Sequence, residues 1–145
     1  MVAYLDSSVV LRHILLGEIA IEHAFACGRV VTSEMLEIEC RRVLHRYRLN
    51  GDLDDQAFVV AIGRLESVLA GLSVITLSGA VKTRAMGSFP VVIKTLDALH
   101  LASALEFAAA HLGRESGETL LVFSHDATMN RCAAALGFAC PFRTE

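Results

Sequence analysis

Four acidic residues have neighbours that suggest chemistry rather than a solvated surface: Asp6, Glu39, Asp97 and Asp126. Carboxylates that meet at one place repel one another, so such a cluster persists only with cations between them. Oxygen ligands without a nearby Cys or His favour magnesium or manganese over zinc. Divalent ions held in this way suit hydrolysis of a phosphodiester, because one ion activates water and another steadies the leaving oxygen. The set therefore predicts a carboxylate metal site for phosphodiester chemistry.

Each acid taken alone also has an ordinary structural role. Asp6 and Asp126 each follow a short apolar run and precede a helical pattern, where an acid would cap the helix. Asp97 lies near the start of a helix, where a negative charge suits the helix dipole. The helix that follows Asp97 is apolar nearly all round, however, which predicts burial between layers. A carboxylate near the start of a buried helix is costly unless it is paired or binds a cation.

Glu39 belongs to an amphipathic helix whose polar side is rich in arginine. The apolar stripe of that helix consists of Leu36, Cys40, Val43, Leu44 and Tyr47. Glu39 falls at one edge of this stripe with Arg42 and Arg46, whereas Glu37 falls at the opposite edge. Glu39 is therefore the better site candidate of the two. We predict that Arg42 and Arg46 contact phosphates of a nucleic acid, and a solvated polar face is the alternative.

An alternation of strands and helices must position these acids. Apolar runs predict strands at 2–5, 29–32, 74–77 and 119–123, and a further short strand at 138–140. Helical patterns occupy 7–16, 18–27, 34–49, 54–69, 78–86, 96–112 and 127–136, with Ser33 as an N-cap and Gly51 as a helix end. These βα units predict an α/β fold, a three-layer α/β/α sandwich around a mostly parallel sheet of about four to five strands. Ligands bind beyond the carboxyl ends of such strands, which places Asp6 and Asp126 at one rim.

The composition fits one α/β domain that spans residues 1–145. The chain is 54% hydrophobic but only 6% aromatic and has no Trp, which suits a sheet covered by helices. The formal net charge of −3 gives no long-range attraction to nucleic acid, so any such site must be a local basic patch. Four cysteines without a C-x-x-C pair predict buried thiols in a reducing compartment, and no histidine lies at zinc-ligand spacing from one of them.

The mean hydropathy of +0.51 is high, so a membrane span has to be considered. The longest stretch without charge, 67–81, contains Gly, Ser and Thr and is shorter than the roughly 20 apolar residues that a span needs. The N-terminus also lacks the pattern of a secretory signal. We therefore expect a cytoplasmic protein without a membrane partner, whose apolar excess fills the core or covers a contact surface.

Other folds that handle phosphate or bind cofactors fit the chain poorly. No G-x-G-x-x-G or Walker pattern follows the first strand. A receiver domain requires an acidic pair near that strand, and an aspartate-nucleophile phosphatase requires another Asp where Ser8 stands. A calcium loop that began at Asp52 would require Glu at the position occupied by Gly63.

The segments around the acids form an ordered set. They are YLDSS at 4–8, a helix start from Thr32 through Glu39 to Arg42, TLDALHLASA at 95–104, and VFSHD at 122–126. In order and spacing this set resembles the acid motifs of PIN-domain ribonucleases of the VapC toxin type. The segment around Asp97 is the closest match, and the resemblance covers essentially the whole chain. His125 replaces a commoner aromatic residue beside the last acid.

The resemblance implies a PIN-like fold and a divalent-metal-dependent endoribonuclease that cuts RNA with magnesium or manganese. By motif match, Asp6 and Asp97 are the core metal ligands. Asp126 and Glu39 complete the shell directly or through water. The expected reaction is attack of water on an RNA phosphodiester.

The resemblance also implies partners and supporting residues. Ser7 and Ser124 stand where family members carry Ser or Thr that orient the acids or waters. A cognate antitoxin that occupies the active-site groove is expected, together with a homodimer. The alternative is a catalytically inactive PIN-fold module that binds protein or RNA, and the retained acids argue against it.

Overall fold

The computed structural model describes residues 1–113 and 116–144, and its centre is a parallel sheet. The strand order is β3-β2-β1-β4. The strands are β1 (Val2–Leu5), β2 (Arg29–Ser33), β3 (Ser73–Ile75) and β4 (Leu120–Phe123). β1 pairs in parallel with β2 on one side and with β4 on the other, and Tyr4 lies opposite both Val31 and Val122. All carboxyl ends of the strands therefore lie at the same edge of the sheet.

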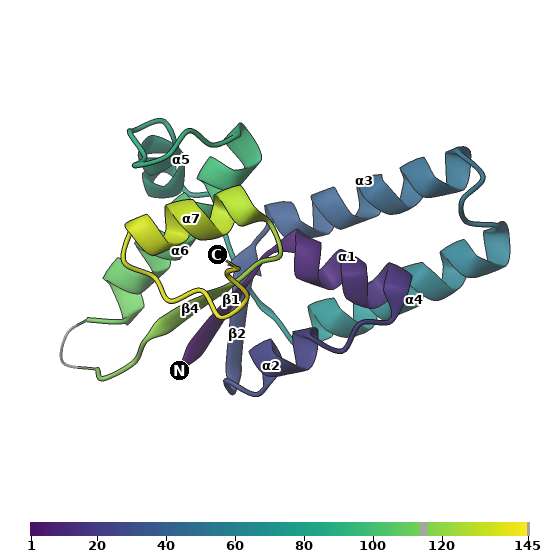
Figure 1. The fold of residues 1–145 in the computed structure, drawn as a ribbon, viewed down its shortest axis with the longest axis horizontal. Coiled ribbons are helices and arrows are strands. Elements are labelled where there is room, and N and C mark those ends of the chain that lie inside the picture. Colours follow the sequence, from purple (N-terminus) through teal and green to yellow (C-terminus); the bar gives the residue numbers. More distant parts are fainter. Residues whose placement is uncertain (114–115, 145) are drawn as a thin grey trace.

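Helices cover both faces of this sheet, as Figure 1 shows. They are α1 (Ser7–Leu16), α2 (Ile21–Phe25), α3 (Met35–Leu49), α4 (Asp55–Ala70), α5 (Gly79–Ala85), α6 (Thr95–His111) and α7 (Ala127–Ala135). Successive strand residues point to opposite faces. Ala3 and Leu5 accordingly pack with residues of α1 to α4, whereas Val2 and Tyr4 pack with residues of α6 and α7. The predicted three-layer α/β/α fold is confirmed, and the sheet, for which four to five strands were predicted, has four strands among the described residues.

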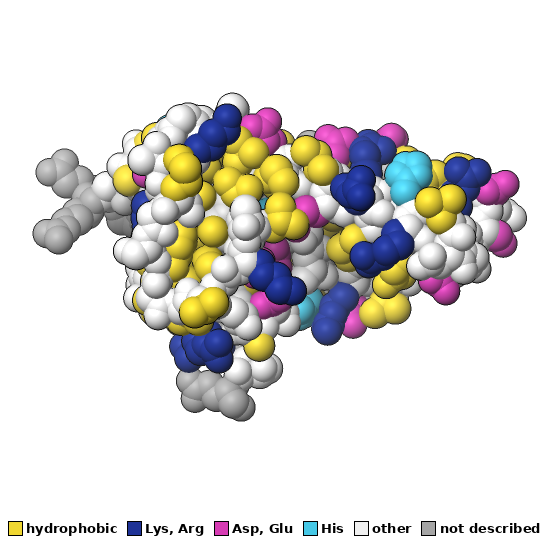
Figure 2. Space-filling view, turned by 90° about the horizontal axis from the view of Figure 1, so that it is seen from above, with side chains coloured by type: hydrophobic (Ala, Val, Ile, Leu, Met, Phe, Trp, Pro, Cys, Tyr) yellow, Lys and Arg dark blue, Asp and Glu magenta, His cyan; other side chains and the backbone are white. Residues whose placement is uncertain are grey.

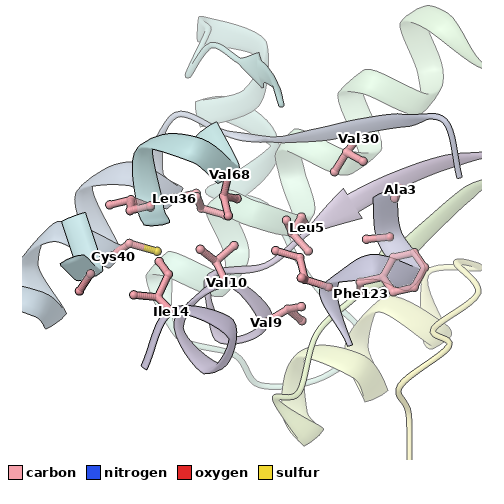
Figure 3. Close-up of a cluster of buried hydrophobic side chains, with 14 of the residues drawn as sticks. Ala3, Leu5, Val9, Val10, Ile14, Val30, Leu36, Cys40, Val68 and Phe123 are labelled. Atoms are coloured by element: carbon pink, nitrogen blue, oxygen red, sulfur yellow. The ribbon is translucent and has the colours of Figure 1, made fainter. Parts of the chain in front are cut away.

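One apolar cluster joins the sheet to α1, α3 and α4. Leu5 and Val30 of the sheet meet Val10 of α1, Leu36 of α3 and Val68 of α4. Figure 3 shows Val10, Leu36 and Val68 close together with Leu5 beside them, and Val30 farther along toward Ala3. All of them are buried. Burying one such side chain contributes about 1.5–3 kcal/mol, so the cluster fixes where α1 and α3 begin relative to the end of β1.

The α3–α4 pair extends away from the sheet as an arm, as Figure 1 shows. Leu44 of α3 and Leu65 of α4 are fully buried and belong to the same apolar cluster. At the tip, Gly51 has a φ of 82°, a conformation that favours glycine. Asp54 then caps α4, because its side chain accepts a hydrogen bond of 2.7 Å from the Ala57 amide. The predicted helix end at Gly51 is thus confirmed.

Two local predictions about the helices are wrong. The helix expected at 18–27 is only α2 (Ile21–Phe25), because the chain turns at Gly17, whose φ is 70°, before the next helix begins. Ser33 belongs to β2 and does not cap α3, since the N-cap position is Glu34. The Ser33 hydroxyl still accepts a hydrogen bond of 3.2 Å from the amide of Met35, the first residue of α3.

The chain end and the cysteines also differ in part from expectation. The strand expected at 138–140 is reduced to a single parallel bridge between Ala139 and Leu121. Cys40 and Cys132 are buried, whereas Cys27 and Cys140 are partly exposed, and all are free thiols. In the part of the chain that the structure describes, no helix combines the length and apolar character needed to cross a membrane.

The arm offers a test of its packing, because α3 carries a fully buried leucine, Leu44, in the arm and an exposed leucine, Leu49, at its end. Leu44→Ala removes a side chain with 0% exposure and should lower the free energy of unfolding by about 2–5 kcal/mol. Leu49→Ala, at 87% exposure on the same helix, should change it by less than about 0.5 kcal/mol. Chemical denaturation of both variants measures the difference, and equal losses would contradict the packing described here.

Candidate functional site

The predicted acids lie around the carboxyl ends of β1 and β4. Asp6 directly follows β1 at the N-cap position of α1, and Asp126 is the N-cap of α7 after β4. Asp97 lies in the first turn of α6, and Glu39 lies near the start of α3. Figure 2, which views the molecule from above relative to Figure 1, shows acidic side chains in a hollow near the centre, between the main body and the arm.

Asp6 is only 4% exposed and is held by hydroxyl groups. Its Oδ2 accepts hydrogen bonds from Ser8 Oγ at 2.8 Å and from Ser124 Oγ at 2.7 Å. It makes no capping bond to α1, so the ordinary capping role considered for Asp6 does not apply. A buried carboxylate needs such donors, because burial without them costs several kcal/mol, of order 2–7 even for a neutral polar group.

The same two serines connect the ends of β1 and β4. Ser8 Oγ accepts a hydrogen bond of 2.9 Å from the His125 amide, and Ser124 Oγ accepts one of 3.0 Å from the Asp126 amide. The backbone that carries Asp126 is thereby fixed relative to Asp6. Ser124 is in contact with an acid, as its motif position suggested.

Ser7 has a different contact from the neighbouring serine. Its Oγ donates to Glu39 Oε2 at 3.3 Å, whereas Ser8 contacts Asp6. Sequence reasoning missed Ser8, because either of two adjacent serines after Asp6 can turn back toward it. Which one does so depends on the direction in which α1 leaves β1.

Asp126 is exposed. The sequence left open whether it caps a helix or is an acid of the site, and its position is compatible with both roles. Its Oδ1 accepts a hydrogen bond of 2.8 Å from the Met129 amide and so caps α7. A carboxylate has two oxygens and about four acceptor positions, so a capping bond leaves the group able to bind a cation.

Glu39 is half-buried and contacts a histidine that sequence reasoning missed. His100 Nε2 forms a hydrogen bond with Glu39 Oε1, and the same nitrogen lies 3.9 Å from Asp6 Oδ1. His100 has 0% exposure, and its Nδ1 lies 2.7 Å from the Tyr4 hydroxyl. A histidine within an otherwise apolar helix was the only sequence signal for this contact.

The charges of the acids shift the pKa of their neighbours. Burial lowers the pKa of His100, but the hydrogen bond to Glu39 and the charge of Asp6 outweigh it, so the pKa is raised. Burial, and then the charge of Asp6, raises the pKa of Tyr4 well above its ordinary value. Burial, followed by the charges of Asp126 and Asp6, raises the pKa of Asp97 to about 6. These shifts show that the acids act on one another electrostatically.

The donor set fits a hard divalent cation. Asp6, Glu39, Asp97 and Asp126 offer oxygen atoms, which magnesium and manganese prefer. Among the described residues, no group of three or more His, Cys, Asp and Glu side chains is placed to hold an ion jointly. Asp6 and Glu39 are instead bonded to Ser8, Ser124, Ser7 and His100. Magnesium keeps several water ligands, so this set suits an ion bound by few side chains.

The arginines of α3 differ in their contacts. Arg41 pairs with Glu37 at 2.7 Å, and Arg48 pairs with Asp55 at 2.9 Å. Arg42 and Arg46 are exposed, and no ion pair is found for either within residues 1–113 and 116–144. Figure 2 shows Lys and Arg side chains along the arm beside the hollow. The arm thus presents cations beside the acids.

Comparison with known proteins agrees with the architecture. The PIN domain model matches residues 3–134, so the chain belongs to the PIN domain family. Its fold is similar to that of a chain in the crystal structure of VapBC2 from Rickettsia felis bound to a DNA fragment from their promoter. The two chains are 11% identical, with a TM-score of 0.66, and the match covers 97% of each. No match is found among curated proteins. The predicted family is therefore confirmed.

The raised pKa of Asp97 predicts how stability depends on pH in the absence of metal. Asp97 makes its full contribution to folding stability below its unfolded-state pKa of 3.8. It loses that contribution as the pH rises through its folded-state pKa of about 6. Asp97→Asn carries no charge and avoids that loss. At pH 7.5 with a chelator, the variant should be more stable by on the order of 1 kcal/mol, a value reduced for the partial exposure of Asp97.

Thermal melts at pH 4 and pH 7.5 measure this effect. The advantage of Asp97→Asn should be mostly lost at pH 4, where Asp97 is neutral in the folded state and only partly ionised in the unfolded state. Mn²⁺ should raise the melting temperature of the wild type and have little effect on the variant. A melting temperature that is higher for the wild type than for Asp97→Asn at pH 7.5 with chelator would contradict the repulsion between Asp97 and the neighbouring acids.

Proposed function

We propose that this protein is a divalent-metal-dependent endoribonuclease that hydrolyses RNA phosphodiester bonds with magnesium or manganese. The main support is geometric: Asp6 and Asp126 follow the neighbouring parallel strands β1 and β4 at one edge of the sheet, and Ser124 hydrogen-bonds both Asp6 and the Asp126 amide. The pKa of Asp97, raised by burial and then by the charges of Asp126 and Asp6, agrees with this placement. Membership of the PIN domain family agrees with this activity. When bound, the metal supplies Lewis-acid activation of water and stabilisation of the leaving oxygen.

The protein's own residues would bind and orient. Asp6 and Asp97 would hold the cation as core ligands, with Asp126 and Glu39 completing its surroundings. Asp6 is fixed by Ser8 and Ser124, so its carboxylate does not have to be ordered when the metal binds.

Arg42 and Arg46 would position the RNA. Both are exposed on α3, the helix that carries Glu39, so an RNA strand that contacts them passes beside the acids. The chain has a net charge of −3, and local cations of this kind are what allow an acidic protein to bind a polyanion.

The proposed biological role is the toxin of a VapBC-type toxin–antitoxin pair that forms a homodimer. The fold similarity to a chain of R. felis VapBC2 supports this role. A groove between α1 and α3 suits a cognate antitoxin segment with apolar and acidic side chains. Its lining consists of Leu11, Arg12, Leu15, Leu16, Val43, Arg46 and Tyr47.

A binding-only PIN module is the second candidate. One observation favours it: Asp6 Oδ2 and both carboxylate oxygens of Glu39 already accept hydrogen bonds from protein donors. In such a module, the carboxylates would have only a structural role, and added metal would not bind to them.

Cleavage of a mixed structured RNA pool separates the two candidates. Wild-type protein with Mn²⁺ or Mg²⁺ should cut the RNA, and Asp97→Asn should reduce the rate by at least about 10²-fold, because an acid of the proposed metal site is lost. A chelator should abolish cleavage by the wild type. Metal binding measured on the same samples identifies the binding-only module, since such a module would show no difference between wild type and Asp97→Asn.

The basic residues of the arm are tested by salt dependence. Arg46→Ala should lower the slope of log affinity for RNA against log salt by about 1, because one phosphate contact is lost. RNA binding is measured without metal, so that no cleavage occurs. Arg29→Ala is the matched control. Arg29 is exposed at the start of β2, at the edge of the sheet opposite to the one that carries the acids. An Arg46→Ala slope equal to the wild-type slope would exclude this contact.

A further inference from the structure

A chain of hydrogen-bonded side chains crosses the molecule from the sheet to Glu39. It begins at Tyr4 of β1, whose hydroxyl lies 2.7 Å from His100 Nδ1. It continues through the imidazole ring to His100 Nε2, which is bonded to Glu39 Oε1 of α3. Tyr4 and His100 both have 0% exposure. Three elements that are distant in sequence are thereby joined at one carboxylate.

The chemistry of the groups fixes which atom faces Glu39. An ionised carboxylate only accepts hydrogen bonds, so Nε2 must carry the proton in this contact. In the neutral ring, Nδ1 is then the acceptor, and the phenol hydroxyl of Tyr4 supplies the donor. In the charged ring both nitrogens donate. In either form, Nε2 donates to Glu39, so the contact does not depend on the protonation state of His100.

The position of His100 also relates Glu39 to Asp6. Its Nε2 lies 3.9 Å from Asp6 Oδ1 while it bonds Glu39. Glu39 is a long side chain on a helix surface, and fixing such a side chain costs up to about 1.5–2 kcal/mol of rotamer entropy. A fully buried donor that is itself hydrogen-bonded at its other ring nitrogen offsets this cost before any ligand arrives.

We propose that His100, itself held by Tyr4, is a positioning residue that keeps the Glu39 carboxylate beside Asp6 in readiness for the cation. The inference rests on the proposed metal-dependent function. His100 acts through Glu39 and touches neither the RNA nor the reacting atoms. A histidine that merely fills the core would affect folding stability but would leave the affinity of a folded protein for metal unchanged.

The test compares two amide substitutions of similar polarity. In His100→Gln, the amide nitrogen can take the place of Nε2 and donate to Glu39, whereas the shorter side chain of His100→Asn cannot reach. Mn²⁺ affinity of the full chain, measured by calorimetry, should fall about 10-fold in His100→Asn, as it does when partners of metal ligands are removed. His100→Gln should stay within about 3-fold of the wild type, which is less than the roughly 10- to 100-fold loss that follows removal of such a partner.

A double-variant comparison shows whether His100 acts through Glu39. If it does, Glu39→Gln combined with His100→Asn should bind Mn²⁺ no more weakly than Glu39→Gln alone, because the carboxylate that His100 positions is already lost. Additive losses would overturn the proposal. Equal losses in His100→Asn and His100→Gln, no loss in either, or tighter binding in His100→Asn would also overturn it.

Two further comparisons keep the result decisive. If His100→Asn does not fold, Tyr4→Phe replaces it, since this change removes only the hydroxyl that holds the ring, and unchanged Mn²⁺ affinity there overturns the proposal. Wild-type protein that binds no Mn²⁺ rejects the proposed function, and this inference with it. Wild-type binding that is lost in Asp97→Asn but kept in His100→Asn rejects only the role of His100.

Discussion

Mutual repulsion among carboxylates at one edge of the sheet is the constraint on which the rest of the structure depends. Asp6 is nearly buried there, and Asp97 is held at a raised pKa by burial and by its acidic neighbours. The surrounding donors offset part of this penalty. Ser8 and Ser124 bond Asp6, and His100 bonds Glu39. A divalent cation would relieve the remaining unfavourable energy, so the proposed metal site and the most destabilised part of the sheet edge would be the same arrangement.

The fold brings these groups together through the direction of its strands. Because β1 lies between β2 and β4 and all run in parallel, residues that follow β1 and β4 meet at one edge. The apolar cluster around Leu5 and Leu36 then brings the start of α3, and with it Glu39, to the same edge. The arm that continues α3 adds cations beside the acids. The core of the protein and the proposed chemistry are therefore fixed by the same packing.

Much of this arrangement could be predicted from particular residues, and the remainder depends on three-dimensional direction. An acid at or just beyond the end of a predicted strand identified Asp6 and Asp126, and the flank shared with arginines selected Glu39 over Glu37. No periodic pattern shows that Ser8 rather than Ser7 turns toward Asp6, or that His100 points at Glu39 across a helix interface. The short α2 and the position of Ser33 in β2 were missed because local preferences yielded to the turn at Gly17 and to strand pairing.

The central place of β1 has a consequence for the order in which the molecule is assembled. β1 is made first, yet one of its two neighbours, β4, begins only at Leu120. Ser124, which fixes Asp6, and Asp126 follow still later in the chain. Such long-range pairing delays folding, because a large loop must close before the contact forms. A ribosome must therefore release nearly the whole domain before Ser124 and Asp126 can join Asp6, so this edge of the sheet is among the last parts of the domain to be completed during synthesis.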